Sequence, residues 1–98
     1  MDKDQENIDA KLVRYRSVTQ AALEKVQLLS KKGTKETDMG KKLLEMAQSY
    51  FTDAQYFEST GMKLTALAAY SYAHAWIDVG VHLGLLDGKN DDKLFILP

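Results

Sequence analysis

Residues 61–84, GMKLTALAAYSYAHAWIDVGVHLG, are apolar around most of their circumference when they are placed on a helical wheel. At about 100° of rotation per residue, small and aliphatic side chains form one stripe and larger side chains form a second stripe beside it. The first stripe consists of Met62, Ala66, Ala69, Ala73, Ile77, Gly80 and Gly84, flanked by Tyr70 and Val81. The second stripe consists of Ala68, Tyr72, Ala75, Trp76, Val79 and Leu83.

A helix that is apolar over roughly 240° must be covered on two sides, because a surface helix needs an apolar face of only about 100°. We therefore expect residues 62–84 to form a helix that two other helices, or a second subunit, enclose. The narrow polar arc of this helix contains Lys63, Ser71, His74, Asp78 and His82, with Leu64 and Leu67 among them.

The preceding sequence predicts two more amphipathic helices, at about residues 7–32 and 35–60. Gly33 is expected in the left-handed conformation after the first helix, with Thr34 as the N-cap of the second, and Gly61 is expected to end that helix. The apolar seam of the first helix is Ile8, Leu12, Tyr15, Thr19, Ala22, Val26 and Leu29. The seam of the second is Met39, Leu43, Met46 or Ala47, Tyr50, Ala54 and Phe57.

These patterns predict an all-α fold, a three-helix antiparallel bundle that forms one domain over residues 1–98. The second and third helices should form a tight hairpin, because only a short turn separates them. Their order of rings and small residues resembles that of one tetratricopeptide hairpin, at Tyr50, Ala54, Phe57, Gly61, Ala66, Tyr70 and Ala73. A single such unit does not make a peptide-binding array, which needs at least about three repeats.

The same hairpin resembles the archaeal domain-of-unknown-function family 357, which comprises small helical proteins without an assigned activity. The residues that carry the resemblance are Tyr56-Phe57, Gly61, Tyr70, Tyr72-Ala73, Trp76-Ile77-Asp78, Gly80, Leu83-Gly84-Leu85 and Leu94-Phe95. The resemblance implies a compact helical bundle, an archaeal origin and self-association, and it supplies no catalytic residues.

Composition excludes several classes of protein. The net charge of −1 provides no overall basic field for nucleic acid or an anionic membrane, and the absence of cysteine excludes disulfides and thiolate chemistry. The start of the chain, MDKDQENIDAK, lacks the apolar segment of a signal peptide, and no apolar run approaches the length of a membrane span. We expect a cytoplasmic protein without a cofactor or a membrane partner.

His74, Asp78 and His82 recur every four residues and so share one face of the third helix. Imidazole and carboxylate groups at this spacing can hold a metal ion, which makes a metal-dependent enzyme one alternative. A solvated polar face is the other interpretation of this ladder. Asp78 is also expected to form a buried ion pair with Arg14 or Arg16 of the first helix. Ser71 shares the face with His74 and Asp78, but a helix offers no free amides for an oxyanion hole.

A second alternative is an RNA-binding or phosphate-binding module at the turn before the second helix. Lysines gather there, at Lys31, Lys32, Lys35, Lys41 and Lys42. Lysines and the free amides at a helix N-terminus can bind phosphate, but no ring is interleaved to stack on bases. A solvated end of the bundle, with lysines that favour the helix C-terminus, is the preferred interpretation of this cluster.

The favoured function is a non-enzymatic interaction or scaffolding module that forms a homo-oligomer or binds an unknown protein partner. The apolar arc of the third helix is wider than intramolecular neighbours require, which motivates this expectation. Two groups of side chains are expected at the interface: Tyr72, Trp76, Val79 and Leu83 of the third helix, and Leu94, Phe95, Ile96 and Leu97 of the C-terminal tail at residues 85–98. Tyr56 adds a ring on the polar face of the second helix.

Overall fold

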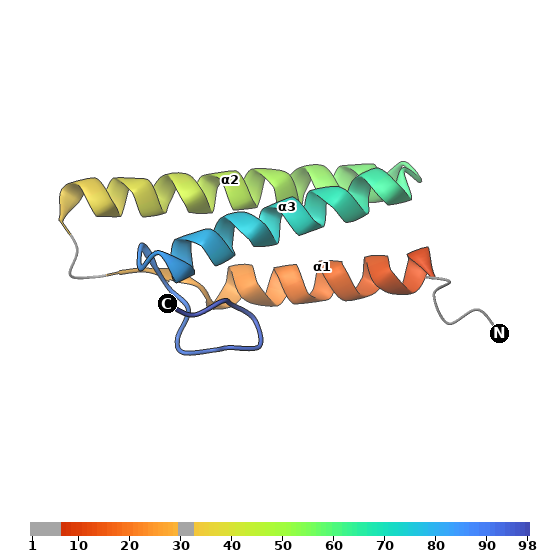
Figure 1. Ribbon diagram of the computed structural model, residues 1–98. Helices are drawn as coiled ribbons and strands as arrows, with labels where there is room; N and C mark the ends of the chain where they lie inside the picture. The colour runs from red at the N-terminus through yellow and green to blue at the C-terminus, as the bar shows by residue number, and fades with distance from the viewer. Residues whose placement is uncertain (1–6, 30–32) are drawn as a thin grey trace.

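The computed structural model describes residues 7–29 and 33–98 of the chain, and within them three helices form an elongated bundle (Figure 1). The elements are α1 (Ile8–Lys25), β1 (Gln27–Leu28), α2 (Thr34–Ser59), α3 (Lys63–His82) and β2 (Leu86–Asp87). Figure 1 shows α2 running antiparallel to both α1 and α3. The predicted all-α antiparallel bundle is confirmed. None of the helices in the described ranges is long and apolar enough to cross a membrane.

Two glycines end the second and third helices, and both ends have the same hydrogen-bonding pattern. Gly61 has a φ of 82° and Gly84 a φ of 76°, a conformation that glycine adopts without a steric cost. At the end of α3, the Gly84 amide donates to Val81 O at 3.1 Å and the Leu85 amide donates to Gly80 O at 2.8 Å. Such a pair of bonds defines a Schellman motif, which turns the chain sharply after the helix. The same pattern after α2 produces the short turn that folds α3 back along α2.

The first helix is shorter than the predicted range 7–32, so that prediction is wrong. The helix ends at Lys25, and Val26 is extended, with a ψ of 142°. Residues Gln27 and Leu28 then pair antiparallel with Asp87 and Leu86 of β2, so their backbone groups bond to a strand instead of a helix. Heptad spacing does not show where a helix gives way to a strand, because Val26 remains buried although it lies outside the helix.

The expected roles of Gly33 and Thr34 at the start of α2 are also wrong. Gly33 has a φ of −64° and is the N-cap of α2, and Thr34 is the first residue of that helix. Gly33 therefore does not take the left-handed conformation. Residues 30–32 lie outside the described ranges.

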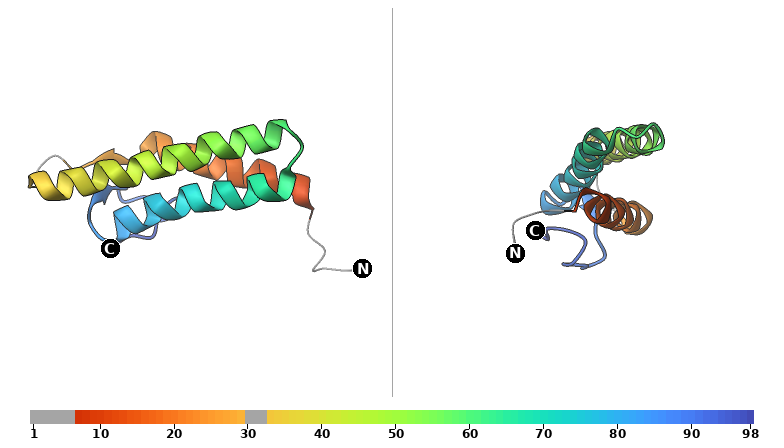
Figure 2. Two further views of the ribbon diagram at one scale, coloured as in Figure 1. Left: turned by 90° about the horizontal axis from the view of Figure 1, so that it is seen from above. Right: turned by 90° about the vertical axis from the view of Figure 1, so that its right-hand side faces the viewer.

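Figure 2 shows α3 lying against both other helices. Its small-residue stripe is buried from Ala66 to Gly80 and packs in both core clusters, whereas Met62 at the start of the stripe is 48% exposed. Ala66, Ala73 and Ile77 have no exposed surface. Thr19, which interrupts the seam of α1, is 2% exposed, and its hydroxyl donates to Tyr70 O of α3 at 3.4 Å. This bond between α1 and α3 accounts for a polar residue in the core, since buried hydroxyl groups need a hydrogen-bond partner.

The stripe of larger side chains on α3 is mostly open, so the other two helices of the chain do not enclose α3 as one of the two expected alternatives required. Tyr72 is 60% exposed, Val79 47% and Leu83 64%, while Trp76 is half-buried. Within the single chain, α3 therefore exposes much more than its narrow polar arc.

Candidate functional site

The ladder of His74, Asp78 and His82 holds the C-terminal tail against α3. His74 Nε2 lies 2.6 Å from Leu94 O, and His82 Nδ1 lies 2.9 Å from Leu97 O. Each of these ring nitrogens faces a carbonyl oxygen, so each carries the proton and donates. Asp78 Oδ1 accepts from the Ile96 amide at 3.2 Å and lies 3.8 Å from His74 Nε2. The three side chains therefore bind the main chain of one segment, residues 94–97.

This arrangement bears on the metal-site alternative. A histidine nitrogen binds a metal ion through a lone pair, whereas the nitrogens of His74 and His82 that face the tail donate protons to carbonyls. Within residues 7–29 and 33–98, no group of three or more His, Cys, Asp or Glu side chains could hold a metal ion. The polar residues recur every four positions because each of them bonds to a different main-chain group of the tail.

The expected ion pair between Asp78 and an arginine of α1 is wrong. Arg16 pairs instead with Glu58 at the end of α2, and the Tyr70 hydroxyl donates to the other oxygen of this carboxylate at 2.7 Å. The three side chains come from three different helices. They tie α1, α2 and α3 together at the end of the bundle where α2 turns into α3.

Burial and hydrogen bonding both shift the ionisation of this cluster. Burial is the main reason why the pKa of Tyr70 is raised to about 12, and the hydrogen bond to Glu58 contributes to the increase. Burial also acts to raise the pKa of Glu58, but the hydrogen bonds from Tyr70 and Arg16 outweigh it and lower that pKa overall. The cluster therefore contains a carboxylate anion, a guanidinium cation and a neutral phenol at physiological pH.

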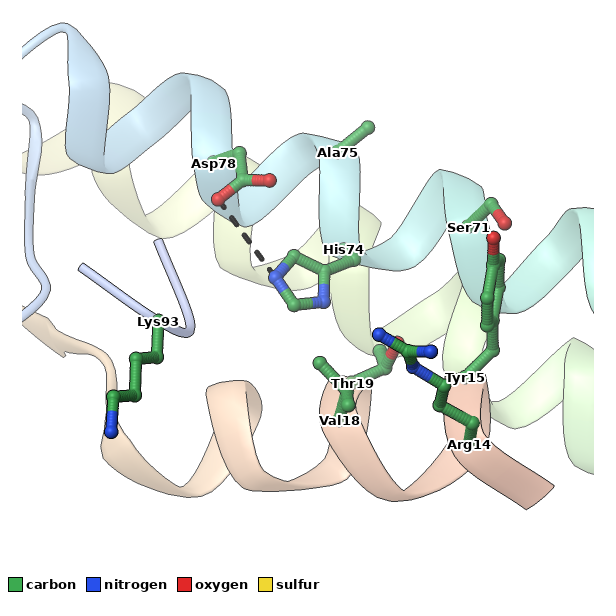
Figure 3. A pocket seen from close by; sticks show the side chains of 9 residues that line it. All are labelled: Arg14, Tyr15, Val18, Thr19, Ser71, His74, Ala75, Asp78 and Lys93. Carbon is green, nitrogen blue, oxygen red and sulfur yellow. Dashed lines mark ion pairs between the residues drawn. The ribbon is translucent and has the colours of Figure 1, made fainter. Parts of the chain in front are cut away.

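A polar hollow of about 390 Å³ lies between α1, α3 and the tail (Figure 3). In Figure 3 the Arg14 side chain extends toward the His74 ring, whereas Lys93 extends away from it. Ser71 Oγ donates to Leu67 O of its own helix at 3.1 Å, and the proton on His74 Nε2 goes to the tail. Ser71, His74 and Asp78 thus share a wall of the hollow without the hydrogen bonds of a nucleophile activated by a base.

An apolar surface runs along the groove between α2 and α3, and no residue of α1 lines it. Two hollows, of about 300 and 220 Å³, adjoin along this groove, because Trp76 and Val79 line both. The rings of Tyr50 and Tyr72 stack across it with their centroids 5.3 Å apart. We call this surface the α2/α3 face. It comprises Met39, Leu43, Met46, Tyr50, Tyr72, Trp76, Val79 and Leu83.

The four predicted interface residues of α3 all belong to this face. Sequence reasoning assigned their α2 neighbours to the buried seam instead, and Met39 is 43% and Met46 38% exposed. The spacing left Met46 and Ala47 as alternatives for one seam position, and the structure places Ala47 in the core with no exposed surface. The available signal was that positions 46 and 47 are both apolar although they lie about 100° apart around the helix, so one narrow seam includes only one of them.

The four apolar residues of the tail have different environments. Phe95 is 3% exposed and packs in the core with Val81 and Leu86, and Leu94 and Leu97 pack against the same cluster. Ile96 is 59% exposed. The tail therefore docks on its own chain, and of the predicted tail interface only Ile96 is free to contact a partner.

The lysine cluster is only partly described. Lys31 and Lys32 lie outside the described residues, while Lys35, Lys41 and Lys42 are exposed on the first half of α2. Lys42 lines the hollow of about 300 Å³ on the α2/α3 face, where its neighbours are apolar. Tyr56 is 63% exposed, as expected for its position, and its ring contacts Phe57 edge to face.

Comparison with known proteins gives a family but no activity. No curated protein and no solved structure matches the chain. A family model described as "Protein of unknown function (DUF357)" matches residues 14–86, which include all of α2 and α3. The chain therefore belongs to the domain-of-unknown-function family 357, as its sequence motifs predicted.

Proposed function

We propose that this protein is a non-enzymatic interaction module that forms a homodimer through its α2/α3 face. The observation that supports the proposal is the exposure of five large apolar side chains along one groove. They are Met39, Met46, Tyr72, Val79 and Leu83. Continuous apolar patches on soluble monomers are usually small, and larger ones mark interaction sites. Rings and methionines are also the residues enriched at the core of protein interfaces.

A second copy fits this face because it has both projections and hollows. Tyr72 and Leu83 project into solvent, and the hollow of about 300 Å³ lies between α2 and α3 beside them. In a two-fold dimer each copy offers the same surface to the other, so the projections of one copy can fill the hollows of its partner. Trp76 lies at the junction of the two hollows, and such contact would cover it.

Sedimentation velocity with a matched pair of variants tests the proposal. Val79 on the face and Val13 on α1 are both helical, and they are 47% and 52% exposed. Val79→Glu should convert a dimer into a monomer, because it would place two unpaired carboxylates in the interface. Val13→Glu should leave the dimer intact. A wild-type protein that sediments as a monomer at micromolar concentration would rule the proposal out.

We also propose a cytoplasmic location and an archaeal origin for this protein. A cytoplasmic location agrees with the absence of cysteine, and an archaeal origin agrees with the family resemblance. A different protein partner on the same face is the outcome to consider if the wild type is monomeric. No observation in the described residues favours RNA binding or metal-dependent catalysis over self-association.

A further inference from the structure

Two oppositely charged residues border the apolar part of the α2/α3 face on α2. Lys42 and Asp53 are both exposed, and neither forms an ion pair within the described residues. They are 11 residues apart, which corresponds to three helical turns, or about 16 Å along the axis. Because 11 residues complete close to three full turns, both side chains project from the same side of α2 as Met46.

The midpoint between these charges coincides with the centre of the apolar surface. It falls between Ala47 and Gln48, next to Met46 and Tyr50. Tyr50 stacks on Tyr72, so the corresponding part of α3 is the ring-bearing segment that contains Tyr72 and Trp76. The face therefore has a positive group toward one end, a negative group toward the other, and rings between them.

We propose that two copies stack their α2/α3 faces with the α2 helices antiparallel, so that Lys42 of each copy pairs with Asp53 of the other. The two-fold axis lies in the interface, perpendicular to the α2 helices. It passes α2 at the level between Ala47 and Gln48. This inference rests on the proposed homodimer and adds its orientation and register. Burial of the rings and methionines provides the affinity, and the two symmetric ion pairs select the orientation.

The alternative two-fold arrangement leaves both charges without a partner. If the axis ran along the groove, α2 of one copy would lie on α3 of the other. The exposed residues of α3 on this face and beside it are uncharged; they are Tyr72, Val79 and Leu83 on the face and Thr65, Ala68 and Ala75 beside it. Lys42 and Asp53 would then be desolvated against apolar side chains, which is unfavourable for charged groups. In the antiparallel stack, by contrast, each dimer contains two ion pairs between Lys42 of one copy and Asp53 of the other.

Charge reversal with mixing tests the register by sedimentation equilibrium. In Lys42→Glu, each ion pair of the homodimer becomes a repulsion between two carboxylates, and in Asp53→Lys each becomes a repulsion between two lysines. Each single variant should dimerise at least about tenfold more weakly than the wild type. An equimolar mixture of the two variants should recover a heterodimer. In it, the glutamate introduced at position 42 of one copy pairs with the lysine introduced at position 53 of the other. The second contact is the native pair of Lys42 and Asp53. The double variant K42E/D53K should dimerise like the wild type.

The controls are charge reversals at neighbouring exposed positions of α2 that point away from the face. Lys41→Glu and Glu45→Lys should leave the dimer unchanged, and far-UV circular dichroism should show equal helix content in every variant. A wild-type dimer that both single variants preserve would overturn the register while the proposed function stands. A mixture that stays monomeric, or controls that weaken the dimer equally, would also overturn the register. A monomeric wild type would overturn both proposals.

Discussion

At the scale of single residues, close contacts depend on small side chains in α3. Gly80 is buried where Leu86 of β2 crosses the helix, and a Cβ at this position would lie 2.8 Å from Leu86 Cγ. Gly40 meets the same segment from α2, where a Cβ would lie 2.9 Å from Leu85 O. Leu85 and Leu86 can therefore approach both helices this closely only because these two positions have no side chain.

The variant Gly80→Ala should destabilise the protein by about 1–3 kcal/mol, because the new Cβ would overlap the side chain of Leu86, which is buried at 3% exposure. Alanine in a helix otherwise stabilises by about 1 kcal/mol relative to glycine, so the packing effect must reverse the usual sign. Urea unfolding measures the difference. Ser49→Ala on the exposed side of α2 serves as the control and should change stability by less than about 0.5 kcal/mol. A stabilised Gly80→Ala protein would contradict the packing argument.

The raised pKa of Tyr70 predicts a specific loss of stability in alkaline solution. Its pKa is raised from 10.0 to about 12 by burial and by the bond to Glu58. A raised pKa means that the neutral phenol stabilises the fold fully below pH 10, and this contribution is lost as the pH rises through about 12. Tyr70→Phe should cost about 1 kcal/mol at pH 8 through the lost hydrogen bond. Since phenylalanine does not titrate, the difference from wild type should then shrink or reverse between pH 10 and 12. Unfolding free energies that fall in parallel would contradict this assignment.

At the scale of elements, periodicity predicted the existence and order of the three helices but not the ends that depend on distant contacts. The end at Gly61 and the buried stripe of α3 follow from local chemistry, so the sequence was sufficient for them. The end of α1 depends on pairing between Leu28 and Leu86, which are far apart in the chain. The ladder was recognised by its spacing, but its partners are main-chain groups of the tail, which no pattern of side chains can reveal.

The C-terminal tail predicts opposite outcomes for two adjacent substitutions. Phe95 is 3% and Ile96 59% exposed, although both lie in the segment held by the ladder. Phe95→Ala should cost about 3–5 kcal/mol, because the ring fills the core beside Val81 and Gly88. Ile96→Ala should cost less than about 0.5 kcal/mol. Thermal unfolding followed by circular dichroism distinguishes them, and equal midpoints for the two variants would show that the tail does not dock on its own chain.

At the scale of the whole molecule, the sequence predicted only part of the exposed apolar surface. The ring-bearing stripe of α3 was expected at an interface, but the α2 half of the face was assigned to the core. Helical periodicity defines angles around one axis and not the distance to the neighbouring helix. In the structure, Ala47 and Ala73 have no exposed surface, so the two helices meet along their small residues. Met46 and Tyr72 are left on the outside of that contact.

Trp76 offers a direct measure of association, because it is the only tryptophan in the chain and it lies on the α2/α3 face. In a homodimer its ring should be covered, and dilution below the dissociation constant should expose it and shift its emission to longer wavelength. The unfolding temperature should rise with protein concentration over the same range, since unfolding is then coupled to dissociation. Val79→Glu should emit at the longer wavelength at every concentration, while Val13→Glu should follow the wild type. Emission and unfolding temperature that are both independent of concentration would mean that no second copy covers this face.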